Sequence, residues 1–248
     1  MPLRSPNRVL TQISGECESR PERPADAARR LVGTRGLDRR PALADSGLVS
    51  PPKTYLLAAI CLALWLEMLF LGGPRSAADA SLLALFNAPA LDPAARLLTR
   101  LGNASVLLPL SVAAALVLGW RVSRRAGLVY LTMILAGRAV VEFEKAMVAR
   151  QRPAPAGQLV HVTTLAFPSG HAAYSMMAWL GLALLAAPAR YRAVAVAAGV
   201  ALALAVGSTR LVLGVHWPSD VIGGWAFGAG WVLLWTRLTE GTAAPARH

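Results

Sequence analysis

Residues 55–72 read YLLAAICLALWLEMLFLG, an apolar run with a single charged residue, Glu67. A helix needs about 20 consecutive apolar residues to cross the core of a bilayer. Further runs of similar composition follow, at about 104–120, 126–149, 171–188, 192–209 and 219–237. The sequence therefore predicts an all-α protein, a bundle of six transmembrane helices over residues 55–237.

The composition of the chain agrees with a membrane protein. Of its 248 residues, 55% are hydrophobic and 15% are charged, whereas soluble domains average about 25% charged residues. These values exclude a disordered chain or a coiled-coil rod and argue against a soluble globule. The net charge of +12 would suggest a nucleic-acid partner in a soluble protein. In a membrane protein we instead expect it to set the orientation, with no nucleic-acid partner.

The two ends of the chain differ from this apolar region. Residues 1–54 are rich in Arg, Pro, Ser and Asp and lack sustained apolar periodicity, so we expect a disordered, basic cytoplasmic tail. Residues 238–248 are expected to form a short C-terminal tail. No cleavable signal is expected, because the first apolar run begins only near Tyr55. Cys17 lies in the tail and Cys61 in the first span, so we expect no disulfide between them.

Positive charges predict the topology. Arginines cluster between spans two and three, between spans four and five, and after span six: Arg121, Arg124, Arg125, Arg190, Arg192, Arg237 and Arg247. These loops are expected to be cytoplasmic. Six spans then place both termini in the cytoplasm, and the loops after spans one, three and five face outward. The outward segment 73–103 is expected to carry a short amphipathic helix, with Leu91, Ala94, Leu97, Leu98 and Leu101 on its apolar side.

Some residues within the spans are unusual. Gly224 and Gly228 are spaced to seat the sixth helix against a neighbour in the same chain, or to form a dimer interface; the first reading is preferred. Arg138 and Glu142 lie one turn apart and are expected to satisfy each other, although charges at membrane depth also indicate function. Glu67 has no evident partner.

Three polar clusters interrupt the apolar chain, and the topology places all of them at the outer ends of spans. The first runs from Lys145 to Pro153, KAMVARQRP, at the end of span three. The residue before a proline disfavours helix, so Arg152 is expected to leave the helix end and reach a ligand that Lys145 also contacts. A pair of cations that extend to the membrane interface is the alternative interpretation.

The second cluster, PSGH, runs from Pro168 to His171 and opens span four. Ser169 is placed as the N-cap and Gly170 leaves the backbone unobstructed. The free N–H groups of a helix start bind anions, and His171 in the first turn could give a proton to a leaving oxygen. A simple helix cap with an interfacial histidine would have the same sequence.

The third cluster joins Arg210, His216 and Asp220 across the start of span six. Pro218 suits the first helical position, which places Asp220 where its carboxylate can reach back to the His216 imidazole. A carboxylate on one ring nitrogen fixes the tautomer and leaves the other nitrogen as a nucleophile. The alternative is a capping aspartate with an interfacial histidine.

Together these clusters supply cations, a helix start, and two histidines, one of them oriented by a carboxylate. Phosphoryl transfer needs this combination, because charge spreads over the phosphoryl oxygens while a nucleophile attacks in line. The clusters resemble the motifs K-x6-R-P, P-S-G-H and S-R-x5-H-x3-D of the type-2 phosphatidic-acid phosphatase family, whose superfamily includes bacterial acid phosphatases and vanadium haloperoxidases. The resemblance covers about residues 55–237, and its one departure is Thr209 in place of serine.

The resemblance implies a role for each motif residue. His216 forms a phosphohistidine, Asp220 supports it, and His171 is the general acid. The phosphate is held by Lys145, Arg152, Ser169, Gly170 and Arg210. Thr209 retains a hydroxyl, so only the fine geometry there is in doubt.

The expected protein is a metal-independent lipid phosphatase without a cofactor, in the bacterial inner membrane with its site facing outward. Its substrate is a lipid phosphate or diphosphate among membrane lipids, and undecaprenyl diphosphate is favoured by resemblance alone. Phosphatidylglycerol phosphate, phosphatidic acid and lipid A phosphates carry a similar head group. A vanadate-dependent haloperoxidase and a non-catalytic lipid transporter or binding protein are the alternatives. A phosphotransferase, which passes the phosphate to an acceptor other than water, is also left open, as is the oligomeric state.

Overall fold

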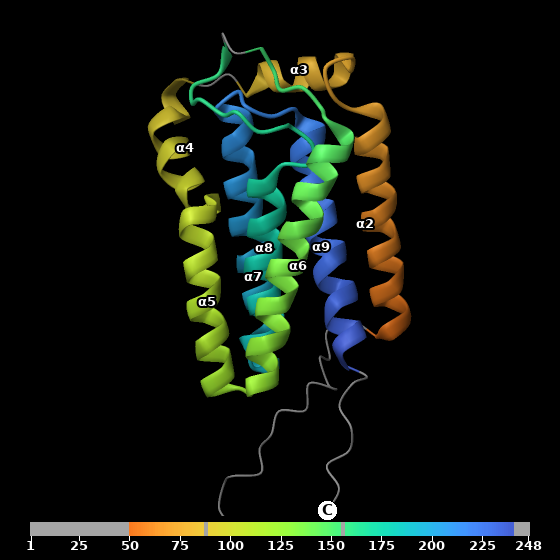
Figure 1. Ribbon diagram of the computed structural model, residues 1–248, viewed down its shortest axis with the longest axis vertical. Coiled ribbons are helices and arrows are strands. Elements are labelled where there is room, and N and C mark those ends of the chain that lie inside the picture. The colour runs from red at the N-terminus through yellow and green to blue at the C-terminus, as the bar shows by residue number, and fades with distance from the viewer. Residues whose placement is uncertain (1–49, 87–88, 155–156, 241–248) are drawn as a thin grey trace, which may run out of the picture. The chain divides into compact units, whose positions relative to one another are not determined.

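The computed structural model describes residues 50–86, 89–154 and 157–240, and within them every regular element is helical (Figure 1). The predicted disordered tail falls almost entirely outside this part of the chain, as do Cys17 and residues 241–248. The first helix begins at Pro51, before the predicted start at residue 55. A proline suits this position because the first N–H groups of a helix have no partner within the helix.

Every predicted apolar run forms a long helix. The bounds are α2 (Pro51–Leu71), α5 (Ala104–Arg121), α6 (Arg124–Val148), α7 (Gly170–Ala186), α8 (Ala189–Val212) and α9 (Pro218–Glu240). Four of them, α2, α5, α6 and α8, are both long and apolar enough to cross a membrane, and α7 is a shorter apolar helix. The fold class is thus all-α, and four of the six predicted spans have the length and hydropathy of a membrane span.

The segment between α2 and α5 differs from the single amphipathic helix that the sequence predicts. It contains α3 (Ala77–Leu85), α4 (Asp92–Leu98) and two short 3₁₀ turns, Pro89–Leu91 and Thr99–Gly102. The predicted apolar face was wrong in detail, because α4 buries Ala95 while Leu97 is 67% exposed. Packing of α4 against α8 decides which side is covered, and periodicity alone does not contain that information.

Helix α7 lies among α5, α6, α8 and α9 and is buried along most of its length. Gly224 and Gly228 of α9 face it: a methyl group on Gly224 would lie 2.7 Å from the Ser169 carbonyl oxygen, and one on Gly228 2.8 Å from that of Ala173. The two glycines therefore seat α9 against a neighbour in the same chain, as preferred from the sequence. Close approach of backbones is the usual role of small residues in membrane bundles.

The helix ends that carry the three polar clusters meet at one end of the bundle. The C-terminal ends of α6 and α8 and the N-terminal ends of α7 and α9 lie together there, beneath α3 and beside α4 (Figure 1). The α5–α6 connection, with Arg121, Arg124 and Arg125, lies at the opposite end. Polar groups far apart in the sequence thus share one end of an otherwise apolar bundle.

Candidate active site

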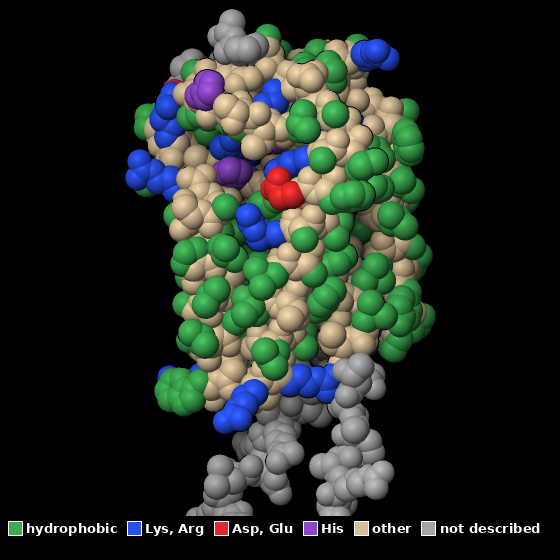
Figure 2. All heavy atoms as spheres, viewed as in Figure 1, with side chains coloured by type: hydrophobic (Ala, Val, Ile, Leu, Met, Phe, Trp, Pro, Cys, Tyr) green, Lys and Arg blue, Asp and Glu red, His purple; other side chains and the backbone are tan. Residues whose placement is uncertain are grey.

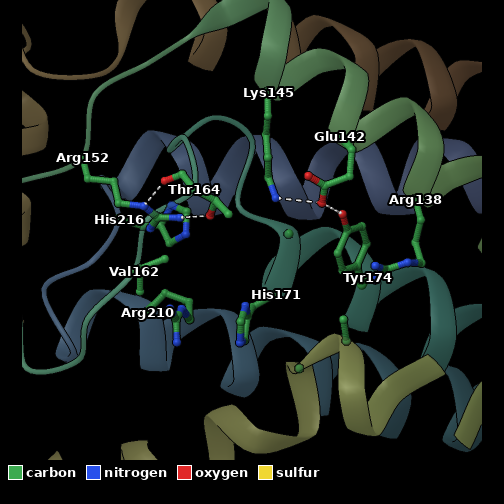
Figure 3. Close-up of a pocket in the computed structure, with 13 residues that line it drawn as sticks. Arg138, Glu142, Lys145, Arg152, Val162, Thr164, His171, Tyr174, Arg210 and His216 are labelled. Carbon is green, nitrogen blue, oxygen red and sulfur yellow. Dashed lines mark hydrogen bonds and ion pairs between the residues drawn. The ribbon is translucent and has the colours of Figure 1, made fainter. Parts of the chain in front are cut away.

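A cavity of about 190 Å³ opens at this end of the bundle. Of the predicted site residues, its lining includes Lys145, Arg152, Gly170, His171, Arg210 and His216. Figure 3 shows the side chains of Lys145, Arg152, His171, Arg210 and His216 directed toward one space from α6, α7, α8 and two loops. Ser169 and Asp220 are fully buried just outside the lining. The structure therefore brings the three clusters together at one cavity.

The first cluster supplies one cation from a helix and one from a loop. Helix α6 ends at Val148, and Ala149 adopts a left-handed conformation (φ 50°) that stops it. The helix thus breaks before Arg152, as the following proline predicts. Lys145 remains in the last turn, where its ammonium pairs with Glu142 Oε1 at 3.0 Å.

Arg152 connects the loops around the cavity. Its guanidinium donates hydrogen bonds to the Thr164 carbonyl at 2.6 Å, the Thr164 hydroxyl at 2.9 Å and the Leu165 carbonyl at 3.2 Å, and also to the Val215 carbonyl. Burial lowers the pKa of Arg152 to about 10, and the nearby Asp220 carboxylate opposes this shift. The side chain therefore carries a full charge at neutral pH.

The second cluster begins helix α7 beside the third. The Ser169 amide donates to the Asp220 carbonyl at 2.9 Å, which joins the two motifs directly. Ser169 is the N-cap residue as predicted, but its hydroxyl makes no capping bond; the buried Oγ lacks a hydrogen-bond partner among the described residues. At Gly170, a methyl group would lie 3.1 Å from the Lys145 ammonium, so glycine leaves room for the cation next to the helix start.

His171 stands in the first turn of α7 and is held from outside the three clusters. Its Nε2 lies 2.9 Å from the amide oxygen of Asn103, the residue that precedes α5. Gly102 approaches the same ring, because a methyl group there would lie 2.7 Å from His171 Cδ2. Asn103 was not among the residues predicted from the sequence. A polar residue just before an apolar span was the available signal, and it resembles an ordinary helix cap.

The third cluster has the predicted geometry. Pro218 begins α9, and Asp220 Oδ2 lies 3.3 Å from His216 Nδ1 while it accepts the Trp217 amide at 2.9 Å. With Nδ1 directed to the carboxylate, Nε2 is the ring nitrogen left for a ligand in the cavity. Burial, followed by the nearby cations Arg152, Arg210 and Lys145, holds the pKa of His216 well below 6.5. The imidazole of the ligand-free protein is therefore neutral.

Asp220 is itself held by a cation that sequence reasoning missed. The guanidinium of Arg150 donates to Asp220 Oδ1 at 3.0 Å and to the Ser219 hydroxyl at 3.0 Å. It also donates to the carbonyls of Met68 and Leu69 at the end of α2. A buried carboxylate needs a partner charge, and this requirement is the signal from which a nearby arginine could have been predicted.

Asp79 of α3 extends the same buried network. Its carboxylate accepts the Ser219 amide at 2.9 Å and the Gly73 amide at 2.6 Å, and it also accepts the Ser219 hydroxyl. A carboxylate at a helix start satisfies N–H groups that lack an intrahelical partner. The amino-terminal end of α9, and with it Asp220, is thus fixed from α2, α3 and the loop after α6.

Arg210 enters the cavity from the last turns of α8. Its Nη1 donates to the Thr99 hydroxyl at 2.8 Å, and its buried Nε has no hydrogen-bond partner within the described part of the chain. Thr209 stands where the family motif has serine, and it does not line the cavity. Its hydroxyl donates to the Val206 carbonyl of its own helix at 2.6 Å. The Nε–H group of Arg210 is therefore available to bind an anion in the cavity.

The expected pairing of Arg138 with Glu142 holds only as a longer-range attraction, because the direct ion pair of Glu142 is with Lys145. Glu142 pairs with Lys145 and accepts a hydrogen bond from the Tyr174 hydroxyl, whereas the Arg138 guanidinium stacks 4.3 Å above the Tyr174 ring. Spacings of three and four residues both bring side chains together on a helix. The position of Tyr174 on α7 favours the three-residue spacing, which is the one between Glu142 and Lys145. All four residues line the cavity. Glu67, by contrast, is exposed on α2.

The cavity as a whole is built for an anion. Four cations, Lys145, Arg152, Arg210 and Arg138, line it together with a helix start and two histidines. Its one acidic lining residue is Glu142, which a lysine already neutralises. Figure 2 shows charged and histidine side chains gathered in a hollow near one end of the molecule, above a largely hydrophobic face.

Comparison with known proteins agrees with this arrangement. A family model described as the PAP2 superfamily matches residues 126–242. The chain is 33% identical over 152 residues to phosphatidylglycerophosphatase B of Bacillus subtilis, a match that covers 58% of this chain and 73% of that protein. The chain belongs to the PAP2 superfamily.

Two further similarities support the assignment to the PAP2 superfamily. The chain is 35% identical over 150 residues to decaprenylphosphoryl-5-phosphoribose phosphatase of Mycobacterium tuberculosis, covering 59% of this chain and 79% of that one. The fold matches the crystal structure of a transmembrane PAP2 type phosphatidylglycerolphosphate phosphatase from B. subtilis, with a TM-score of 0.66 and 23% identity over 79% of this chain and 99% of that one. The relatives of this PAP2 protein are phosphatases, and its apolar helices together with the fold of a transmembrane PAP2 protein indicate an integral membrane protein.

Proposed function

We propose that the protein hydrolyses a phosphate monoester or diphosphate of a lipid through a phosphohistidine at His216. The observation that carries the proposal is the pairing of His216 Nδ1 with the Asp220 carboxylate at 3.3 Å, beside a cavity lined by cations. The carboxylate stabilises the positive charge that develops on the ring during attack. A nucleophile of this kind acts on phosphorus when fixed positive charge surrounds the phosphoryl oxygens.

The reaction proceeds in two steps. In the first, Nε2 of His216 bonds to phosphorus while the bond from phosphorus to the lipid oxygen breaks, and His171 gives a proton to that oxygen. In the second, His171 takes a proton from water, the water oxygen bonds to phosphorus, and the phosphorus–nitrogen bond breaks. Inorganic phosphate leaves and both imidazoles return to their starting state.

The cations and the start of α7 have a common role in both steps. Lys145, Arg152 and Arg210 line the cavity from three directions, and the amide groups at Gly170 add the positive end of a helix. Fixed donors aimed at developing negative charge are the largest contribution to many enzymatic rate accelerations. Ser169, whose buried hydroxyl has no partner in the described residues, is proposed to donate to the bound phosphate.

We propose that all six long helices, over residues 55–237, form a membrane domain with the site on the extracytoplasmic side of a bacterial inner membrane. The charge distribution supports this orientation, because Arg121, Arg124 and Arg125 lie at the end opposite the cavity and arginines favour the cytoplasmic side. An orientation with the site outside would let the enzyme act on lipids of the outer leaflet.

Phosphate release by the purified full-length protein tests the proposed activity. The panel contains phosphatidylglycerol phosphate, phosphatidic acid, undecaprenyl diphosphate and a lipid A phosphate in detergent micelles. We expect release of inorganic phosphate from at least one of them and inhibition by vanadate. No release from any member of the panel would contradict the proposal, and vanadate-dependent oxidation of bromide would favour a haloperoxidase instead.

We expect activity to be unchanged in excess EDTA. The cavity places cations where a metal-dependent phosphatase would place carboxylates, and its Glu142 is already paired with Lys145. Initial rates are measured with and without EDTA, followed by readdition of Mg²⁺. A loss of activity in EDTA that Mg²⁺ restores would show that a metal ion takes part.

A further inference from the structure

The segment that precedes α5 contacts two site residues although it lies outside all three motifs. It consists of the 3₁₀ turn Thr99–Gly102 and Asn103. The Thr99 hydroxyl accepts a hydrogen bond from Arg210, and the amide oxygen of Asn103 lies 2.9 Å from Nε2 of His171. One short stretch of chain thus contacts both a cation of the cavity and the histidine that begins α7.

Asn103 occupies the N-cap position of α5 but does not use its side chain as a cap. Asparagine is favoured at this position because its side-chain oxygen accepts an N–H group of the first helical turn. Here the side chain makes no capping bond, and the main-chain carbonyl of Asn103 accepts the Val106 amide instead. At the start of α6, by contrast, the Ser123 hydroxyl accepts the Ala126 amide at 3.1 Å. The amide oxygen of Asn103 is therefore directed to His171 in place of its own helix.

The contact with Asn103 determines which nitrogen of His171 is available for chemistry. A carbonyl oxygen accepts hydrogen bonds and donates none, so Nε2 carries a hydrogen in this pair. Gly102 covers the same edge of the ring, because a methyl group there would lie 2.7 Å from Cδ2. Nδ1 lies on the opposite edge of the imidazole, and His171 lines the cavity. Nδ1 is therefore the nitrogen that can exchange protons with a ligand.

We propose that Asn103 is a positioning residue, which fixes the ring of His171 and its Nε2–H group so that Nδ1 transfers the proton in both steps of the reaction. In the first step, the proton on Nδ1 passes to the lipid oxygen as the bond from phosphorus to that oxygen breaks. In the second step, the lone pair left on Nδ1 takes a proton from the attacking water. This inference rests on the proposed phosphatase activity and adds to it a residue from outside the three motifs.

The two histidines of the cavity differ in the group that holds them. His216 pairs through Nδ1 with the Asp220 carboxylate at 3.3 Å, whereas a neutral amide holds His171. A carboxylate favours the positively charged ring, which suits a histidine that carries phosphate. A neutral amide orients the ring and leaves it free to release its proton, and it does not repel an anionic substrate. Each partner therefore suits the role proposed for its histidine.

The test compares two phosphate esters that differ in their need for a proton donor. Dodecyl phosphate releases a strongly basic alkoxide, whereas a nitrophenyl phosphate with a dodecyl chain on its ring releases a weakly basic phenolate. General acid catalysis contributes about 10²- to 10⁴-fold. We expect Asn103→Leu to lower kcat/KM for dodecyl phosphate by about 10- to 100-fold, and kcat/KM for the nitrophenyl ester by less than about threefold. The ratio of the two values does not depend on the folded fraction of the preparation.

A second arm follows the step in which water attacks. With the labelled nitrophenyl ester, Asn103→Leu should form the phosphoprotein at the normal rate and hydrolyse it slowly, so a larger fraction of the protein carries label at steady state than in the wild type. His171→Ala should show the same pattern, because Asn103 acts through that ring. Asn103→Ala removes the acceptor without adding volume, and it gives the same comparison where Asn103→Leu yields little folded protein.

Ser123→Ala is the matched control. It removes a capping bond at the opposite end of the bundle, so it should lower the unfolding temperature and leave the ratio of the two kcat/KM values unchanged. Equal losses on both esters in the Asn103 variants, or unchanged values on both, would overturn the positioning role and leave the phosphatase intact. Absence of phosphate release by the wild-type protein from these esters and from the lipid panel would refute the proposed activity itself.

Discussion

Replacing His216 with alanine is expected to lower phosphate release by at least about 10⁴-fold, since removal of a covalent nucleophile leaves only binding and electrostatic stabilisation. His216 is almost fully buried against Asp220, and no other histidine in the described part of the chain has a carboxylate on Nδ1. The measurement is the initial rate of phosphate release in detergent, together with a rapid acid-free quench that detects labelled phosphate bound to protein.

His161→Ala provides the matched control. His161 lies in the loop before α7, is exposed, and does not line the cavity, so its replacement should leave both the rate and the labelled protein unchanged. A His216→Ala protein that elutes as a folded species and still turns over at more than a few per cent of the wild-type rate would refute the assignment of the nucleophile. If labelled phosphate still bound to the protein in that variant, a residue other than His216 would be the nucleophile.

The helices and their ends follow closely from local sequence. Apolar runs of the right length predicted all six long helices, and Pro218 marked the start of α9. The break between Lys145 and Arg152 was predicted from Pro153, and the structure adds the left-handed Ala149 that stops the helix. These features depend on neighbouring residues alone, which is why sequence reasoning finds them.

The motif residues of the site could be predicted from the sequence, but the residues that hold them in position could not. The spaced motifs name the groups that line the cavity, because phosphoryl chemistry restricts which residue types can stand there. Asn103, Asp79 and Arg150 act across elements that are distant in sequence, and their partners depend on how the helices pack. The pairing of Glu142 was missed for a similar reason, because Tyr174 reaches it from another helix.

Among the residues that hold the site in position, Arg150 is the one whose replacement is expected to lower stability and kcat the most. Its side chain does not line the cavity, yet its guanidinium holds the Asp220 carboxylate that orients His216, and it connects this carboxylate to the end of α2. The ion pair is almost completely buried, with side-chain exposures of 6% and 0%. Removal of one partner from such a pair costs about 3–5 kcal/mol, because the other charge stays buried without compensation.

Arg150→Met is therefore expected to lower the unfolding temperature in detergent and to lower kcat by about 10²- to 10³-fold while KM changes little, because substrate does not contact this residue and only the imidazole loses its orientation. A structural role alone predicts a lower amount of folded protein with normal turnover per folded molecule. The active fraction is therefore counted by the amount of labelled phosphoprotein formed.

The double variant Arg150→Met/Asp220→Asn separates stability from positioning. With both charges removed, no uncompensated charge stays buried, so the unfolding temperature should recover much of what Arg150→Met alone loses. Activity should stay low, because an amide cannot stabilise the imidazolium as a carboxylate does. Arg96→Met, which breaks a partly exposed pair with Asp92, should cost less than about 1 kcal/mol and leave kcat unchanged. Recovery of activity together with stability would show that Arg150 only holds the fold, since the orientation of His216 would then not depend on the charged pair.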